Sequence, residues 1–324
     1  MEKILEEKEE NIKVVVNTLK KGGVVIVPTD TVYGLISGGF NDRSKEKIYE
    51  IKKRDYKKML IGFVDTIEKA EKYIEIDRQF IKEKWPGSTT IIGKSKIEIP
   101  FLTSDEKKIG LRIPDNKFLL DVLKNFEIIA STSANISGEK TPSCLSEISD
   151  EVKNKVDLII NGGKTEGKES TIWDVSFSPP KLVRGKVIFV CEGNSCRSPM
   201  AEYFLKNFLK EKNVKIEVNS AGTGITSWGK ISDKTLEVMK KVGIEIKNFV
   251  SKPLNFQMLK ESDLIFVMEK EQKEKILSII PKEENKIFVL DVPDPAGKEL
   301  FHYEEIRDII KEKVKNIVLK RMAI

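Results

Sequence analysis

The chain has 324 residues, of which 40% are hydrophobic and 33% charged, a composition typical of a soluble globular protein with about two domains. The 57 lysines and arginines exceed the 51 aspartates and glutamates only slightly, so the net charge of +6 is weak evidence for nucleic-acid binding and a better indication of anionic substrates. Three cysteines and one histidine exclude a disulfide framework and a Cys/His zinc site. Because no long apolar run occurs and the first residues are highly charged, we expect a cytoplasmic protein with no membrane partner.

The first half of the chain alternates helical and extended patterns, and two extended segments end in polar residues. A charged helix is predicted over about residues 4–20, and a buried strand at 24–27 runs into the polar turn 28–35. A later strand at 128–130 runs into the hydroxyl-rich segment 131–138. Such segments can be turns held by local side-chain bonds to the backbone, but strand ends are also where α/β proteins bind ligands.

Positive charge gathers at the end of a helix predicted over about residues 44–51. The basic cluster 52–54 is followed closely by Lys57 and Lys58. A cluster of this kind is usually a solvated face, but it is also what a triphosphate requires. Together with the two polar strand ends, it predicts a nucleotide site.

Five motifs in this half follow one another in a set order. They are Pro-Thr-Asp-Thr-Val-Tyr-Gly-Leu at 28–35, Lys-x-Arg at 52–54, Trp-Pro-Gly-x-x-Thr at 85–90, Arg-Ile-Pro at 112–114 and Ser-Ala-Asn-x-Ser-Gly at 133–138. The set resembles the YrdC-type threonylcarbamoyl-AMP synthases over about residues 12–186, and this implies a twisted α/β domain over residues 1–185. That family makes L-threonylcarbamoyladenylate from ATP, L-threonine and bicarbonate, with release of pyrophosphate, for the threonylcarbamoyladenosine modification of tRNA. The resemblance further implies Mg²⁺ accompanying ATP, RNA binding, and tRNA or tRNA-modification proteins as partners.

The resemblance also assigns residues to ATP and threonine binding. It implies that the charge of the triphosphate and of the developing pyrophosphate is neutralised by Lys52, Arg54 and Arg184. Hydrogen bonds to phosphate oxygens would come from Ser133, Asn135 and Ser170. The threonine side of the site would be formed by Thr29, Thr31, Tyr33 and Thr90, and Arg112 of the Arg-Ile-Pro motif is the last residue assigned to ATP and threonine binding.

The sequence departs from the family pattern after Arg54. Asp55 and Met59 stand where prolines are usual, and Phe63 stands about where a histidine faces the substrate. We therefore keep open a second hypothesis, in which this half only binds nucleotide or RNA.

The second half opens on a cysteine at the end of a buried strand predicted at residues 187–190. A Gly193-Asn194 turn follows, and Ser198-Pro199 marks the start of a helix. The backbone N–H groups of such a loop and the helix dipole favour an oxyanion, and the same field should favour the thiolate of Cys191. Arg197 can return a bidentate guanidinium to the phosphoryl oxygens. A lone cysteine is more often a buried structural residue, but the Cys-x5-Arg spacing, the turn and the helix start coincide here.

The remaining pattern of this half alternates strands and helices. A helix over about 199–211 is followed by strands at 216–218, 264–268 and 287–290, which predicts a four-stranded parallel sheet with helices on both faces. Asp291 and Asp294 follow the last strand, so their carboxylates should emerge at the same edge of the sheet as Cys191.

This loop resembles the active-site loop of the low-molecular-weight protein tyrosine phosphatases, and the match extends over residues 186–324. The resemblance implies catalysis through a cysteinyl-phosphate, without a cofactor. The catalytic residues would be Cys191, Arg197, Asp294, Ser198 and Asn194. Asp294 would be the general acid, with Asp291 as its rival. The remaining phosphate-loop residues would be Glu192, Gly193, Ser195 and Cys196, the last of which can form a reversible disulfide with the nucleophile in that family.

The substrate of this second domain is left open between phosphotyrosine and phosphoarginine, in a phosphorylated protein or a small phosphoester. Ser195 resembles the small hydroxyl residue of the protein-arginine phosphatases, whereas Ala296 after Asp294 offers no aromatic wall for either substrate. The leading hypothesis is a bifunctional enzyme with both activities. A third hypothesis is a redox or arsenate-reductase-like protein built on the same loop.

Overall fold

The computed structural model describes residues 3–212 and 214–323, and it divides the chain into two compact units, Met1–Ser178 and Pro179–Ile324. The domain boundary predicted between residues 185 and 186 falls inside one continuous strand, β10 (Lys181–Cys191), which belongs to the second unit. Within the described residues, no helix is both long and apolar enough to cross a membrane.

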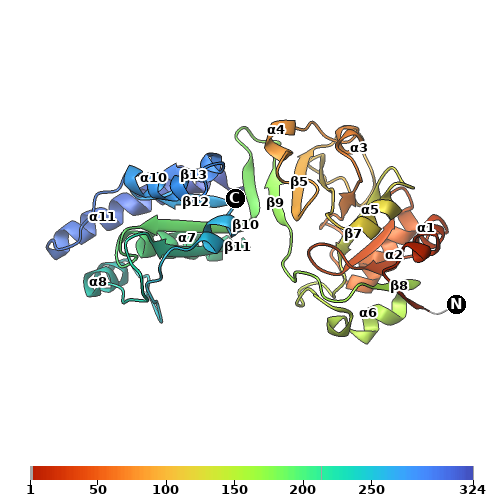
Figure 1. The fold of residues 1–324 in the computed structure, drawn as a ribbon, viewed down its shortest axis with the longest axis horizontal. Helices are drawn as coiled ribbons and strands as arrows, with labels where there is room; N and C mark the ends of the chain where they lie inside the picture. The colour runs from red at the N-terminus through yellow and green to blue at the C-terminus, as the bar shows by residue number, and fades with distance from the viewer. Residues whose placement is uncertain (1–2, 213, 324) are drawn as a thin grey trace. The chain divides into compact units, whose positions relative to one another are not determined.

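The first unit is built on a mixed sheet with the strand order β1-β8-β2-β3-β7-β4-β6-β5-β9 (Figure 1). The strands are β1 (Ile4–Glu6), β2 (Val25–Val27), β3 (Gly34–Gly38), β4 (Ile61–Phe63), β5 (Thr89–Lys94), β6 (Lys108–Arg112), β7 (Ile129–Ser133), β8 (Leu158–Asn161) and β9 (Thr171–Asp174). The helices are α1 (Ile12–Lys20), α2 (Asp42–Lys52), α3 (Ile67–Glu71), α4 (Arg78–Ile81), α5 (Lys117–Leu123) and α6 (Asp150–Lys155). A core formed by α1, α5 and the sheet buries side chains that include Val15, Leu19, Val25, Leu119 and Val122.

The start of the helix predicted over residues 4–20 is wrong. Ile4–Glu6 forms β1, which pairs in parallel with β8, and the α-helix begins only at Ile12. The reason is that residues 6–10 are all charged and offer no apolar helix face, whereas pairing satisfies the backbone of Ile4 and Leu5.

The two polar segments singled out in the sequence lie side by side in the first unit. β3 pairs antiparallel with β7, so that Gly34 is opposite Ser133. The backbone N–H of Ala134 donates to the carbonyl of Tyr33 at 2.8 Å, which extends the pairing into both polar segments. The sheet therefore brings 28–35 and 131–138 together, as their positions at strand ends suggested.

The second unit confirms the predicted parallel sheet with helices on both faces. The sheet has the order β11-β10-β12-β13 and contains β11 (Ile216–Gly222), β12 (Leu264–Val267) and β13 (Ile287–Val289). Its helices are α7 (Arg197–Glu211), α8 (Asp233–Lys241), α9 (Phe256–Glu261), α10 (Lys270–Ile279) and α11 (Leu300–Lys313) (Figure 1). Ile188 and Val190 of β10 pack with residues of α9 and α10, whereas the alternate residues Phe189 and Cys191 point to the face that α7 covers.

Candidate functional sites

The cysteine loop joins β10 to α7 and holds Cys191 at the last position of the strand. Asn194 adopts a left-handed conformation with φ of 48°, a conformation that asparagine tolerates better than most residues. Its side-chain oxygen accepts from the backbone N–H of Lys252 at 2.9 Å, and its amide nitrogen donates to Ser198 Oγ at 2.9 Å and to Ser220 Oγ at 2.8 Å. The turn of the loop is therefore fixed by hydrogen bonds from three sides.

Cys191 is buried, with its sulfur 3.0 Å from Ser198 Oγ. Burial raises the pKa of the Cys191 thiol, and the hydrogen bond with Ser198 and the charge of Arg197 act in the opposite direction. The hydrogen bonds of the loop and the charge of Arg197 therefore act toward the thiolate, but the removal of the sulfur from water has the larger effect on its pKa.

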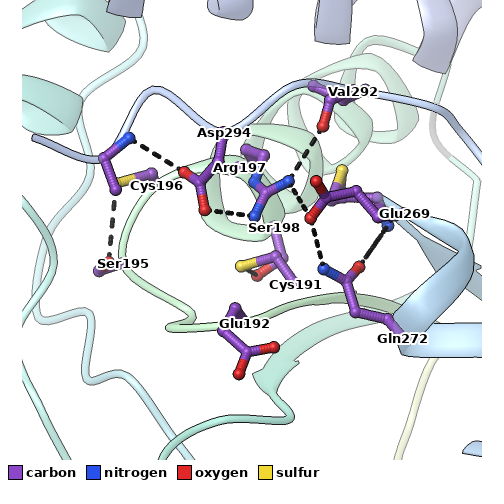
Figure 2. A network of polar contacts seen from close by, with 12 residues as sticks. Cys191, Glu192, Ser195, Cys196, Arg197, Ser198, Glu269, Gln272, Val292 and Asp294 are labelled. Carbon is purple, nitrogen blue, oxygen red and sulfur yellow. Dashed lines mark hydrogen bonds and ion pairs between the residues drawn. The ribbon is translucent and has the colours of Figure 1, made fainter. Parts of the chain in front are cut away.

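Arg197 begins α7, and the residue is only 1% exposed. Its Nη2 contacts Asp294 at 2.5 Å, and its Nη1 contacts Glu269 at 2.6 Å and the carbonyl of Val292 at 3.0 Å (Figure 2). Both arms of the predicted phosphate clamp thus hold carboxylates. An anion that binds this guanidinium has to compete with them.

Glu269 is a residue that the sequence analysis missed. It lies directly after β12 and before α10, and Gln272 donates to its carboxylate at 3.0 Å (Figure 2). The signal was present, because an acidic residue at the carboxyl end of a parallel strand lies at the same edge of the sheet as Cys191.

The two aspartates after β13 occupy different environments. Asp294 reaches Arg197, and its other oxygen accepts from the backbone N–H of Ala296 at 3.0 Å. Asp291 is exposed and has a left-handed φ of 54°. The structure therefore brings Asp294, and not its rival, to the cysteine loop.

The other loop residues lie around this centre. Glu192 points away from Arg197 and binds Lys275 at 3.1 Å and Thr223 at 2.9 Å, and these contacts lower its pKa (Figure 2). Cys196 is buried with its sulfur 3.6 Å from the hydroxyl of Tyr303, whose pKa is raised to about 12 by burial and by this contact. The remaining two residues of the loop, Gly193 and Ser195, are partly exposed.

In the first unit, Lys52 joins the basic cluster to the segment 131–138. The residue is 1% exposed, and its ammonium donates to the carbonyls of Ser133 at 2.5 Å and Asn135 at 2.6 Å, and to Asn135 Oδ1 at 3.0 Å. Burial, together with the nearby charge of Arg54, lowers the pKa of Lys52 to about 7, and the charge of Glu169 acts in the opposite direction. Three of the predicted ATP-binding residues are thus in direct contact.

Arg112 organises a second group in this unit. Its guanidinium donates to Thr31 Oγ1 at 2.9 Å, and Thr31 contacts Thr29 Oγ1 at 2.9 Å. Asp30, which the sequence analysis did not single out, forms an ion pair with Arg112 at 2.5 Å. Phe63, at the position of the expected histidine, lies with its ring 5.7 Å from the same guanidinium.

The other predicted residues of the first site lie in separate contacts. Thr90 and Ser170 are 3.0 Å apart through their hydroxyls. The Tyr33 hydroxyl donates to the carbonyl of Gly163 at 2.9 Å. The Arg54 guanidinium donates to the carbonyls of Lys58 and Met59 at 2.8 and 2.9 Å. Arg184 lies on β10, in the second unit.

The geometry defines two enzyme-like α/β units, one with a cysteine-arginine loop and one with a cationic, hydroxyl-rich strand edge. Residues 17–185 match the model of the Sua5/YciO/YrdC family, which carries the description "Telomere recombination", and residues 186–323 match the low molecular weight phosphotyrosine protein phosphatase family. The chain therefore belongs to the Sua5/YciO/YrdC family through its first domain and to the low molecular weight phosphatase family through its second, and both are families of enzymes.

Individual relatives agree with this division. A provisionally named threonylcarbamoyl-AMP synthase of Methanocaldococcus jannaschii is 37% identical over 199 residues, which are 59% of this chain and 91% of that protein. The protein-arginine-phosphatase of Bacillus subtilis is 32% identical over 140 residues, which are 40% of this chain and 93% of that protein. The crystal structure of E. coli YciO is 30% identical, with a TM-score of 0.51, and the match covers 54% of this chain and 89% of YciO.

Proposed function

We propose that the second domain is a cysteine-dependent protein phosphatase that acts through a cysteinyl-phosphate. The observation that carries this proposal is the placement of Arg197, in contact with Asp294 and Glu269 and beside Cys191 on the same short loop. A nucleophile and a guanidinium on one loop, with a carboxylate in contact with that guanidinium, are the parts that phosphoryl transfer to a thiol requires.

In the proposed first step, the Cys191 thiolate forms a sulfur–phosphorus bond while the bond from phosphorus to the leaving oxygen or nitrogen breaks. Arg197 and the loop N–H groups hold the phosphoryl oxygens, and Asp294, protonated for this step, gives its proton to the leaving atom. In the second step, Asp294 takes a proton from water as the water oxygen attacks phosphorus. The sulfur then leaves, and orthophosphate is released.

The substrates that we propose are phosphoarginine and phosphotyrosine in proteins, and they can be compared directly. Wild type and Cys191→Ser would be assayed for orthophosphate release from matched peptides that carry one or the other modification. We expect the wild type to release phosphate from at least one peptide and the variant to lose about 1,000-fold or more of that activity. Retained activity in Cys191→Ser would contradict the assignment of the nucleophile.

We further propose that the first domain makes L-threonylcarbamoyladenylate from ATP, L-threonine and bicarbonate for tRNA modification. The contact of Lys52 with Ser133 and Asn135 supports this, because it gathers a cation and polar groups at one strand edge. Mg²⁺ would arrive with ATP, held by phosphate oxygens and water. Across the described residues, no group of three or more His, Cys, Asp or Glu side chains is placed to hold a metal.

The synthase proposal is tested by pyrophosphate release that depends on both threonine and bicarbonate. We expect Cys191→Ser to retain this activity and Lys52→Met to lose about 10- to 100-fold of it, because a buried charge contact to phosphate is removed. Binding of ATP without threonine-dependent pyrophosphate release would instead support a domain that binds nucleotide only.

A further inference from the structure

The side chains assigned to the threonine side of the first site are buried as a group. Thr29, Thr31, Tyr33 and Thr90 are at most 5% exposed, and so is Arg112, which donates to Thr31. A substrate can touch such side chains only after a covering segment has moved aside. The segment that moves should be weakly held and in contact with this group.

One exposed segment meets both conditions. Residues 162–169, here called the cover loop, join β8 to β9 without regular secondary structure, and all of them are exposed except the half-buried Thr165. The backbone N–H of Gly167 donates to the carbonyl of Thr31 at 2.8 Å. Thr165 donates to the carbonyl of Ser143 through its backbone N–H at 2.8 Å and through Oγ1 at 3.1 Å. The cover loop therefore lies directly against the buried group.

The composition of the cover loop leaves polar contacts as the means of holding it. Its sequence is Gly-Gly-Lys-Thr-Glu-Gly-Lys-Glu, without an apolar side chain that could anchor it in the core. Gly163 and Gly167 have left-handed φ angles of 74° and 75°, which glycine adopts at no steric cost. A Cβ on Gly163 would meet no atom within 4 Å, so glycine is needed there for the backbone and not for space. The two glycines can thus act as hinges for the residues between them.

The hydroxyl of Tyr33 fastens the first of these hinges. It accepts from the backbone N–H of Gly162 at 3.0 Å and donates to the carbonyl of Gly163 at 2.9 Å. Burial raises the pKa of Tyr33, so the hydroxyl keeps its proton at neutral pH. A phenol has one proton to donate, and here the cover loop takes it.

We propose that the cover loop opens to admit the amino-acid substrate and closes over it, and that Tyr33 is a positioning residue whose hydroxyl holds the loop shut. The inference rests on the proposed synthase function and concerns the same site. Tyr33 acts through the backbone of Gly162 and Gly163, and the loop it holds is bonded in turn to Thr31.

Tyr33→Phe tests the latch, because it removes the hydroxyl and keeps the ring. Limited digestion with trypsin reports the open state, since Lys164 is exposed but the next residue, Thr165, has to leave Ser143 before a protease can bind the chain. When opening and closing are fast relative to cleavage, the rate follows the population of the open loop. We expect the Lys164–Thr165 bond of Tyr33→Phe to be cut about 3- to 10-fold faster than in wild type, as measured from the first fragments by mass spectrometry.

Two controls distinguish a latch from a general loss of stability. Tyr49→Phe removes a buried hydroxyl that donates to the carbonyl of Lys58 at 2.9 Å, and it should leave the cleavage after Lys164 at the wild-type rate. Within Tyr33→Phe itself, the bond after Lys107, in the exposed turn between β5 and β6, should be cut as in wild type. Equal acceleration at the two bonds would mean that Tyr33 only stabilises the unit, and it would overturn the proposal, as would an unchanged rate after Lys164.

If Tyr33→Phe does not fold, as judged by its thermal transition, Thr165→Val decides. It removes the Oγ1 contact with Ser143 and keeps the shape of the side chain, so the bond after Lys164 should be cut about 2- to 5-fold faster. An unchanged rate in that variant would then overturn the proposal.

L-threonine provides the readout that a merely structural role would not move. A substrate held under the closed loop should slow the cleavage after Lys164 by mass action, about tenfold at ten times the Kd measured by calorimetry. Bound threonine that leaves this rate unchanged would overturn the proposal. A wild type without threonine binding and without threonine-dependent pyrophosphate release would instead refute the proposed function, and the digestion of Tyr33→Phe would still decide whether Tyr33 holds the loop.

Discussion

Two buried cations, Arg197 and Lys52, show how differently a protein can prepare for an anion. Each is 1% exposed, but Arg197 contacts two carboxylates, whereas the acceptors in direct contact with Lys52 are neutral oxygens. Burial lowers the pKa of Lys52 to about 7 because neutral dipoles compensate only part of the cost of removing its charge from water. The first arrangement holds its cation with charges, whereas the second surrounds its cation with neutral oxygens, to which Glu169 adds a nearby negative charge.

The difference predicts two ways of binding phosphate. At Arg197 a phosphoryl group has to exchange with a carboxylate, and Asp294, once displaced from Nη2, is free for proton transfer to the leaving group. At Lys52 a triphosphate would add negative charge, so that anion binding and protonation of the lysine support each other. Each mode can be tested by removing the feature that distinguishes it.

Asp294→Asn is expected to have the largest effect, and in opposite directions on catalysis and binding. The loss of the acid should lower kcat about 100- to 10,000-fold. The loss of its charge should tighten inhibition by orthophosphate or vanadate about 3- to 10-fold, because the anion no longer competes with a carboxylate for Nη2. Steady-state kinetics with each inhibitor measures both effects.

Asp291→Asn is the matched control for that variant. Asp291 lies in the same segment, is exposed and has a left-handed φ that asparagine also tolerates. We therefore expect kcat and the inhibition by orthophosphate or vanadate to stay at their wild-type values. Weaker inhibition by vanadate in Asp294→Asn would show that Asp294 does not compete with the anion, and it would remove the contrast between the two cations.

The affinity of the first domain for ATP should depend on pH through Lys52. A lysine with its pKa lowered to about 7 is protonated below that pH and loses its proton above it, so the Kd for ATP should rise by up to about tenfold per pH unit above pH 7. Calorimetric titration of Cys191→Ser from pH 6 to 9 measures this dependence without phosphatase activity.

Two variants sharpen that measurement. Lys52→Met should bind ATP more weakly and lose the added pH dependence, whereas Lys53→Gln, which changes an exposed neighbour paired with Glu151, should keep it. A Kd in wild type that is flat between pH 6 and 9 would mean that the ammonium of Lys52 does not meet the triphosphate.

The sequence predicted the cysteine loop well because its parts are local. Cys191, Asn194, Arg197 and Ser198 lie within eight residues, and a strand, a turn and a helix start fix their relative positions whatever the rest of the fold does. The parallel sheet of the second unit was also predictable, since its buried strands read as apolar runs between helical patterns. The structure places Asp294 at this loop through strand order alone.

The residues that the sequence analysis missed depend on contacts between distant parts of the chain. Glu269 is 72 positions from Arg197, and the only sign of their contact in the sequence is that Glu269 follows a buried strand whose carboxyl end lies at the same edge of the sheet. The same holds for the helix predicted from residue 4, because β1 is decided by pairing with β8 about 155 positions away. Local spacing therefore predicts the residues that we propose to react, whereas the groups that contact them from other strands follow from the order of the sheet.

Glu269→Gln should have a smaller effect than Asp294→Asn or the loss of the Lys52 charge, because it removes a charge but keeps a hydrogen-bond acceptor for Arg197. Nη1 keeps its contact with the carbonyl of Val292, and the glutamine oxygen can still accept from the guanidinium. We expect kcat to fall about 3- to 10-fold and vanadate inhibition to tighten less than in Asp294→Asn, since Glu269 orients the guanidinium and leaves the phosphoryl position on Nη2 free. Comparison with Asp294→Asn distinguishes the two carboxylates. If Glu269 holds the arginine and Asp294 occupies the place of the phosphate, only the Asp294 change should abolish proton transfer to the leaving group. Equal losses of kcat in the two single variants would instead mean that both carboxylates serve one role at Arg197.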